Sequence, residues 1–159
     1  MTLPVLPPLR LKAADIEDVA VISACLQDAI LPVADAEWLA EERSFVMAIN
    51  RFRWEAPRDA APSRIHAGLR IAGVRSIQSK GFDRRQRDLL LSLLALDWAP
   101  DSQAADGTGT LTLIGAADRS LRFQVERLLV TLEDFGEPWP AASRPTHSVV
   151  RDSEQGDGR

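Results

Sequence analysis

The first part of the chain carries apolar residues at helical spacing. Between residues 15 and 29 they recur every three or four positions, which predicts one amphipathic helix. Asp15 is placed to cap the first turn, with Asp18 three residues later in a capping-box arrangement. We expect the helix to end before Pro32, because the residue before a proline avoids helical geometry. Upstream, the proline-rich stretch 3–9 predicts an extended arm.

From residue 33 onward the apolar period shortens towards two, which predicts β-strands. The stretch 89–98 is also compatible with a short helix, but a nearby proline, Pro100, and a polar loop bound it, so we interpret it as a strand. Gly73 interrupts another strand, where we expect a kink. The predicted strands span residues 33–39, 44–54, 65–79, 89–98, 110–114, 119–125 and 127–133.

One helix followed by six or seven strands in hairpin succession predicts an α+β fold. In this fold the N-terminal helix packs on a curved antiparallel sheet, with a partial barrel as an open alternative. A chain of 159 residues can bury one sizeable core. We therefore expect an extended N-terminal arm (1–12), a single domain (13–142) and a polar, disordered C-terminal tail (143–159).

The composition is that of an ordinary globular protein, with 45% hydrophobic and 26% charged residues. The lone cysteine, Cys25, cannot form an internal disulfide, so nothing indicates an oxidising compartment. The start of the chain lacks the charged and apolar segments of a secretory signal. The longest apolar run, 89–96, is far shorter than the ~20 residues that span a bilayer. The expected location is the cytoplasm, without a membrane partner.

The net charge of −4 is distributed unevenly along the chain. The segment 51–87 holds ten Lys and Arg against three Asp and Glu, whereas the remainder holds nine against twenty. A concentration of positive charge suits a surface for acidic proteins, phosphates or a second, acidic copy of the chain. The question is whether these basic residues share one face of the folded protein.

Alternation along two predicted strands indicates that they do. A bulge near Asn50 would send the two aromatic residues of 51–54 into the core and both arginines outward. On the following strand, the side chains at positions 66 and 70 lie opposite the apolar face. If these strands are neighbours, their basic side chains form one surface, with further charge from the turn near residue 81. The candidate binding residues are Arg51, Arg53, His66, Arg70, Lys80, Arg84, Arg85 and Arg87.

Catalytic and metal signatures are weak. The possible soft ligands Cys25, His66 and His147 lie far apart without metal-binding spacing, so we expect no metal and no cofactor. Cys25 has no positively charged sequence neighbours to lower its pKa, which predicts an inert thiol. Glu133 and Asp134 could supply acid–base chemistry if burial separated their pKa values, although turn chemistry is the more common role for such residues.

Three functional hypotheses follow. The charge pattern favours a non-enzymatic binding or adaptor module, whose basic face engages an acidic protein or a second copy of the chain. The same face could instead bind RNA or a nucleotide, although the chain is acidic overall. The third hypothesis is a small enzyme with acid–base carboxylates at Glu133 and Asp134.

Several local strings occur in an order that resembles one known family. They are Asn50-Arg51-Phe52 with Trp54, the segment 76–81, and the segment 132–139 followed by Arg144-Pro145-Thr146-His147. In this order the chain, from about residue 11 to 147, resembles the bacterial family called domain of unknown function 2948. The resemblance implies a small bacterial cytoplasmic protein without an assigned activity. It supplies no family functional residues to carry over.

Overall fold

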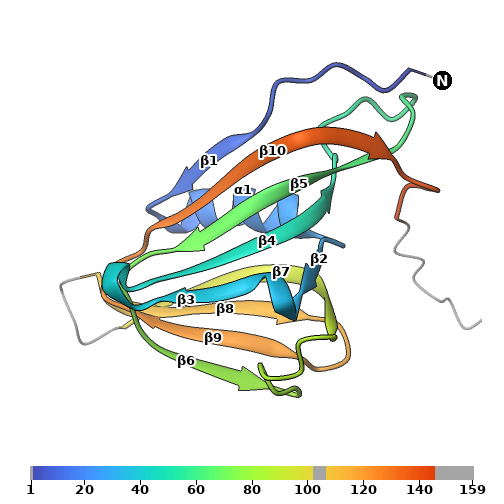
Figure 1. The fold of residues 1–159 in the computed structure, drawn as a ribbon. Helices are drawn as coiled ribbons and strands as arrows, with labels where there is room; N and C mark the ends of the chain where they lie inside the picture. Colours follow the sequence, from blue (N-terminus) through green and yellow to red (C-terminus); the bar gives the residue numbers. More distant parts are fainter. Residues whose placement is uncertain (1, 102–106, 146–159) are drawn as a thin grey trace, which may run out of the picture.

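The computed structural model describes residues 2–101 and 107–145. Within these ranges the chain forms one α-helix, two 3₁₀ turns (Val33–Asp35 and Ala40–Glu42) and ten strands (Figure 1). The predicted helix and antiparallel sheet are confirmed. The elements are β1 (Arg10–Ala13), α1 (Ile16–Leu26), β2 (Ile30–Pro32), β3 (Ala36–Leu39), β4 (Ser44–Phe52), β5 (Ser63–Ile71), β6 (Val74–Lys80), β7 (Leu90–Pro100), β8 (Gly109–Gly115), β9 (Ser120–Val125) and β10 (Val130–Pro140).

The expected count of six or seven strands is wrong, for two physical reasons. β1 and β2 are only four and three residues long, too short for an alternating pattern to show in the sequence. The predicted strand 65–79 is two strands, β5 and β6, because the chain turns at Gly73 with a positive φ of 65°. Glycine adopts that backbone conformation at little cost, so the expected kink is a complete turn.

The ten strands form one strongly bent sheet in the order β1-β10-β5-β4-β2-β7-β8-β9-β6, and β3 pairs with β4 beside β2. Figure 1 shows the strands β1, β10, β5 and β4 as one layer and β8, β9 and β6 as another. The short β2 joins the two halves, because it pairs with both β4 and β7. β1 and β6 end the strand order, so the sheet is not closed.

The hydrophobic core lies between the two halves. Phe45 on β4 and Phe123 on β9 meet across it, with ring centroids 5.2 Å apart. The helix α1 packs on β7 and β1 and buries Val19, Ile22 and Leu26. Full burial of such aliphatic side chains contributes about 1.5–3 kcal/mol each. The predicted helix cap is present, since the backbone N–H of Asp18 donates to the Asp15 carboxylate at 2.8 Å, closing the first turn.

The alternation of β4 decides which residues face the core. β4 pairs with β5 without interruption from Phe45 to Phe52, so the bulge expected near Asn50 is absent. The inward face therefore continues to Arg51, which is buried. Phe52 lies on the outward face but is also buried, packing on Trp54 with ring centroids 4.7 Å apart. The prediction that Arg51 points outward is wrong.

The two ends of the chain bear on the expected domain limits. β1 takes up the last residues of the expected arm and continues the sheet beyond β10. Most of the expected tail, residues 146–159 with His147, lies outside the described residues. No helix in the described ranges has the length and apolar character needed to cross a bilayer.

Candidate functional site

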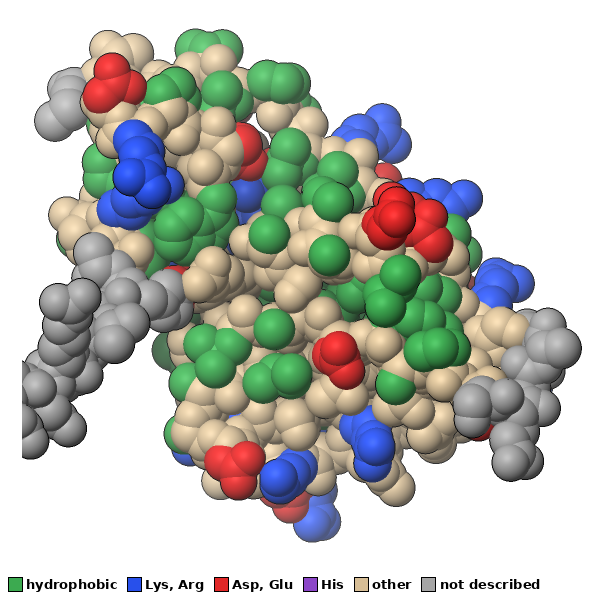
Figure 2. All heavy atoms as spheres, turned by 180° about the vertical axis from the view of Figure 1, so that it is seen from behind, with side chains coloured by type: hydrophobic (Ala, Val, Ile, Leu, Met, Phe, Trp, Pro, Cys, Tyr) green, Lys and Arg blue, Asp and Glu red, His purple; other side chains and the backbone are tan. Residues whose placement is uncertain are grey.

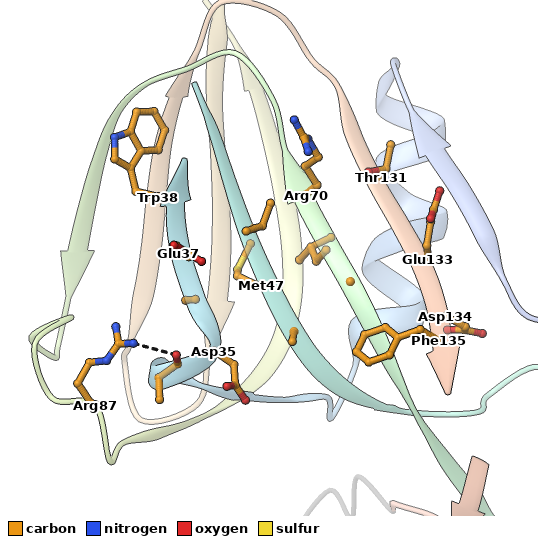
Figure 3. A pocket seen from close by; sticks show the side chains of 16 residues that line it. Asp35, Glu37, Trp38, Met47, Arg70, Arg87, Thr131, Glu133, Asp134 and Phe135 are labelled. Carbon is orange, nitrogen blue, oxygen red and sulfur yellow. Dashed lines mark hydrogen bonds between the residues drawn. The ribbon is translucent and has the colours of Figure 1, made fainter. Parts of the chain in front are cut away.

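The outward face of β3, β4, β5 and β10 is hollowed into a groove of about 1020 Å³ (Figure 3). The side chains on its floor are small, because Ala48 on β4 lies directly opposite Gly68 on β5. Phe135 on β10 borders the groove on one side and is half exposed. On the other side β3 contributes Glu37, which pairs with outward Val46, whereas Trp38 pairs with Phe45 and turns its ring to the opposite face of β3. The groove thus has small residues in its centre and an exposed aromatic ring at one margin.

Charges of both signs line the groove. Its carboxylates include Asp35, Glu37 and Glu133, and its two arginines are Arg70 and Arg87. Several of these charges are already compensated by residues at the rim. Arg70 pairs with Glu42 at 2.6 Å, and Arg10 reaches Glu133 at 3.5 Å. Exposed pairs of this kind contribute about 0–1 kcal/mol, so an incoming partner can replace them.

An aromatic cluster extends the groove along the next row of the sheet. His66 on β5 pairs in register with Phe135 on β10, and their rings stack with centroids 5.6 Å apart and an angle of 15°. Trp139 also packs on His66, with ring centroids 4.6 Å apart. A smaller hollow of about 190 Å³ lies beside this row and shares Ala48 and Phe135 with the groove. The two hollows therefore form one continuous surface.

Behind this surface, on the inward face, lies a buried ion cluster of Arg51, Asp134 and Glu55. The side chains of Arg51 and Asp134 are only 1% and 2% exposed. Arg51 Nε and Nη2 donate to the two Asp134 carboxylate oxygens at 2.8 and 2.7 Å. Nη1 and Nη2 donate to Glu55 at 3.2 and 2.9 Å, and Nη1 also donates to the Phe52 carbonyl at 3.1 Å. All five guanidinium N–H groups are therefore satisfied.

The cluster changes the electrostatics around Arg51. Burial acts to lower the pKa of Arg51, but the hydrogen bonds with Asp134 and Glu55 outweigh it and hold that pKa above its ordinary value. The guanidinium is therefore permanently charged, and Asp134 is its fixed partner. A buried pair of this kind is strongly destabilised when one partner is removed, because the other charge stays in a poorly solvated place.

The same cluster anchors the N-terminal arm. Leu9 donates its backbone N–H to Asp134 Oδ2 at 2.8 Å, and its carbonyl accepts the Asp134 N–H at 2.9 Å. A cavity of about 570 Å³ lies between the arm residues 2–8 and the Arg51 cluster. Half-buried Cys25 on α1 is close enough to interact electrostatically with this cluster. Burial, as the largest effect, raises the pKa of the Cys25 thiol, while Arg51 opposes that rise.

The structure separates the predicted basic residues instead of gathering them on one face. β4 and β5 are neighbours, as assumed, but Arg51 and Arg53 are buried, and Arg53 Nη1 donates to Ser63 Oγ at 3.2 Å. His66 and Arg70 lie on the outward face of β5, as predicted. The expectation of a single basic surface that includes both buried arginines is therefore wrong.

The remaining predicted residues lie at the end of β6 and in the loop that follows it. Lys80 reaches Asp118 at 3.3 Å, Arg85 pairs with Asp83 at 3.0 Å, and Arg87 Nη2 donates to the Ala34 carbonyl at 2.9 Å. The Asp83 hydrogen bonds raise the pKa of Arg85. Arg84 is exposed on the same loop. The rear view in Figure 2 shows Lys and Arg side chains scattered among carboxylates.

The sequence predicted Arg70, Arg87 and Glu133 as candidates, but not the floor or the aromatic margin of the groove. Ala48 and Gly68 are small outward residues on two strands, a signal that is visible only once the register of β4 against β5 is known. Phe135 lies beyond the predicted strand 127–133, but β10 continues past it, and its parity places it outward like Glu133. Within the described residues no group of three or more His, Cys, Asp or Glu side chains could hold a metal ion.

Comparison with known proteins gives one match. A family model described as "Protein of unknown function (DUF2948)" matches residues 9–147. No match was found among curated proteins or among solved structures. The matched range contains every strand and the helix of the described structure.

Proposed function

We propose from the geometry that this chain, which belongs to the DUF2948 family of proteins of unknown function, is a non-enzymatic binding module. Membership in the family itself assigns no activity. Its groove on β3, β4, β5 and β10 takes a segment of a partner protein. The observation that carries this proposal is the paired Ala48 and Gly68 at the groove floor, flanked by exposed Phe135.

The fold itself gives no reason for the hollow. A Cβ added at Gly68 would meet no atom closer than the Glu133 carbonyl oxygen, at 4.0 Å. The φ angle of Gly68 also lies outside the left-handed range. A larger residue would therefore fit and cover apolar floor. An open floor beside an exposed aromatic ring is typical of interaction surfaces, where aromatic side chains supply much of the binding energy.

The charges favour a protein partner over RNA. A single-stranded nucleic acid needs exposed aromatic rings beside positive charge. Here the ring of Phe135 is exposed, but Glu133 and Glu37 lie on the same outward face of the sheet. Both phosphate-binding candidates of this segment are buried, Arg51 on β4 and Arg53 just after it. A partner protein can present charges of both signs to such a groove, whereas a polyanion cannot.

The acid–base alternative has lost its main support. Both carboxylate oxygens of Asp134 accept hydrogen bonds from Arg51, and one also accepts the Leu9 N–H. Glu133 is exposed and reaches Arg10. The two neighbouring carboxylates point to opposite faces of β10 and do not form a catalytic pair.

The test fills the groove without touching the core. Gly68→Leu covers the floor, and Thr112→Leu places the same side chain on the outward face of β8 as a matched control. Each variant and the parent protein are purified gently from the protein's own host, and copurifying proteins are measured by native mass spectrometry and by sedimentation velocity.

We expect the parent and Thr112→Leu to carry the same partner, and Gly68→Leu to lose it at least tenfold. If the parent and Thr112→Leu have the mass of two chains and Gly68→Leu has the mass of one, the partner is a second copy of the chain. Equal partner recovery with both variants would reject the groove as the binding surface. A parent protein that is monomeric and without a partner would reject the binding module itself.

A further inference from the structure

We propose that the seam between β3 and the loop after β6 is a second binding site, which takes a small amphipathic carboxylate. The apolar part of the ligand enters a slot into the core, and its carboxylate lies at Arg84 and Arg87. This site is distinct from the groove floor at Ala48 and Gly68 and does not depend on the function proposed above.

The slot is a cavity of about 180 Å³ with an apolar interior. Its inner wall consists of side chains that are at most 4% exposed and belong to the core, namely Leu31, Val33, Phe45, Leu91 and Leu121. At its mouth are Ala36, Trp38 and Phe82. A cavity that is lined by core side chains and also reaches surface residues gives a ligand a path into the interior.

The topology explains why the slot exists. In the described sheet β3 pairs only with β4, and β6 pairs only with β9. These two strands therefore do not join, and the sheet stays open between them. Trp38 on β3 and Phe82 just after β6 flank this opening without filling it. Figure 3 shows Trp38 and Arg87 together on the side of the groove away from Phe135 and Glu133.

The size and lining of the slot select the apolar part of the ligand. An apolar cavity of about 150 Å³ stays dry and accommodates benzene, because its walls offer water no hydrogen-bond partners. A slot of about 180 Å³ therefore fits an aliphatic chain or ring of about six carbon atoms. Larger acyl chains would have to displace core side chains.

The charge at the mouth selects the other end of the ligand. Arg84 and Arg87 both line the slot, and no Asp or Glu of the described chain does so. The nearby Asp83 carboxylate is held by Arg85. Arg87 uses Nη2 for the Ala34 carbonyl, which leaves further N–H groups of its guanidinium for an anion. Two guanidiniums above an apolar slot match a carboxylate on a short apolar chain.

The test uses hexanoate as the probe and 1-hexanol as its uncharged counterpart. Binding is followed by methyl NMR on the full chain, with Leu31, Val33, Leu91 and Leu121 as reporters and Val19 and Leu132 as reference methyl groups. The charge is removed in Arg84→Gln/Arg87→Gln, with Arg58→Gln/Arg122→Gln as a control on exposed arginines. Ala36→Leu and the milder Ala36→Val narrow the mouth of the slot.

We expect hexanoate to shift the reporter methyl groups and leave the reference methyl groups unchanged. Loss of both arginines should weaken hexanoate binding about tenfold and leave hexanol binding unaltered, since two exposed pairs together contribute on the order of a tenfold change. The control arginine variant and Gly68→Leu should bind like the parent, and the Ala36 variants should bind neither probe.

Absence of reporter shifts at saturating hexanoate would overturn the site. Binding that survives in both folded Ala36 variants would place the probe elsewhere and would also overturn it. Equal affinity for hexanol and hexanoate, with no effect of the arginine variant, would refute the carboxylate as the recognised group.

Discussion

At the scale of single residues, Arg51 shows what sequence reasoning can and cannot reach. The alternation of Phe45, Met47 and Ile49 continues without a break to Arg51, so the pattern alone would have placed this arginine inside. The aromatic residues Phe52 and Trp54 lie on the opposite parity, which argued for a bulge. The partner, Asp134, is 83 residues further along the chain, where no local pattern reveals it.

Replacing Arg51 should be among the most destabilising single changes in this protein. Arg51→Ala leaves Asp134 buried without its counter-charge and should lower the free energy of unfolding by about 3–5 kcal/mol. Arg85→Ala removes an arginine from an exposed ion pair and should leave the free energy of unfolding nearly unchanged. Urea unfolding followed by circular dichroism measures both. Similar small losses for the two variants would show that the cluster is not a stabilising unit.

Cys25 gives a pH-dependent prediction. Burial raises the pKa of its thiol above the ordinary value of 9.0, so the folded state disfavours the thiolate. The stability that this provides is complete below pH 9 and is lost as the pH rises through the folded pKa, because the unfolded thiol ionises first. As the pH rises above 9, the parent should therefore lose more stability than Cys25→Ala. Parallel pH profiles of the two proteins would contradict the shift.

At the scale of elements, length decided what the sequence revealed. α1 and the long strands β4, β7, β8 and β9 were predicted close to their observed limits, because each carries several repeats of its period. β1 and β2 have no room for such a repeat, and each is held by neighbours distant in sequence. The groove depends on β3, β4, β5 and β10 lying side by side, which is a property of pairing and not of any one element.

The attachment of the arm before β1 can be tested at one hydrogen bond. Leu9→Pro removes the backbone N–H that donates to Asp134, and hydrogen bonds to charged groups contribute about 1.5–3 kcal/mol. Val5→Pro makes the same change at a side chain that is 97% exposed. Leu9→Pro should lower the free energy of unfolding by at least 1 kcal/mol, and Val5→Pro should leave it unchanged. Equal midpoints in urea would show that the arm is not anchored there.

At the scale of the whole molecule, the last described strand completes the sheet. β10 lies between β1 and β5 and supplies Asp134, so its loss would expose both neighbours and the Arg51 charge. The sequence could predict that the strands are antiparallel from their short connections, but not that the final strand enters beside the first. Strand order of this kind comes from packing the whole core.

This placement predicts a sharp dependence on the C-terminal boundary. A chain that ends after Leu128 lacks all of β10 and should remain unfolded, with a collapsed range of amide chemical shifts. A chain that ends after Pro145 keeps every described strand and should give the well-dispersed spectrum of the parent. A folded spectrum from the shorter chain would show that the sheet does not need β10.

The pairing of β1 with β10 also has a consequence for synthesis on the ribosome. Ala13 cannot pair with Val130 until Val130 has been synthesised, about 120 residues later in the chain. At about 5–20 residues per second, roughly 6–24 s pass before the two can meet. Throughout that time the nascent chain displays an unpaired β1, and once residue 71 is made it also displays an open flank of β5. Both are sites for aggregation or for chaperones. The rate of translation therefore sets how long each new molecule remains vulnerable.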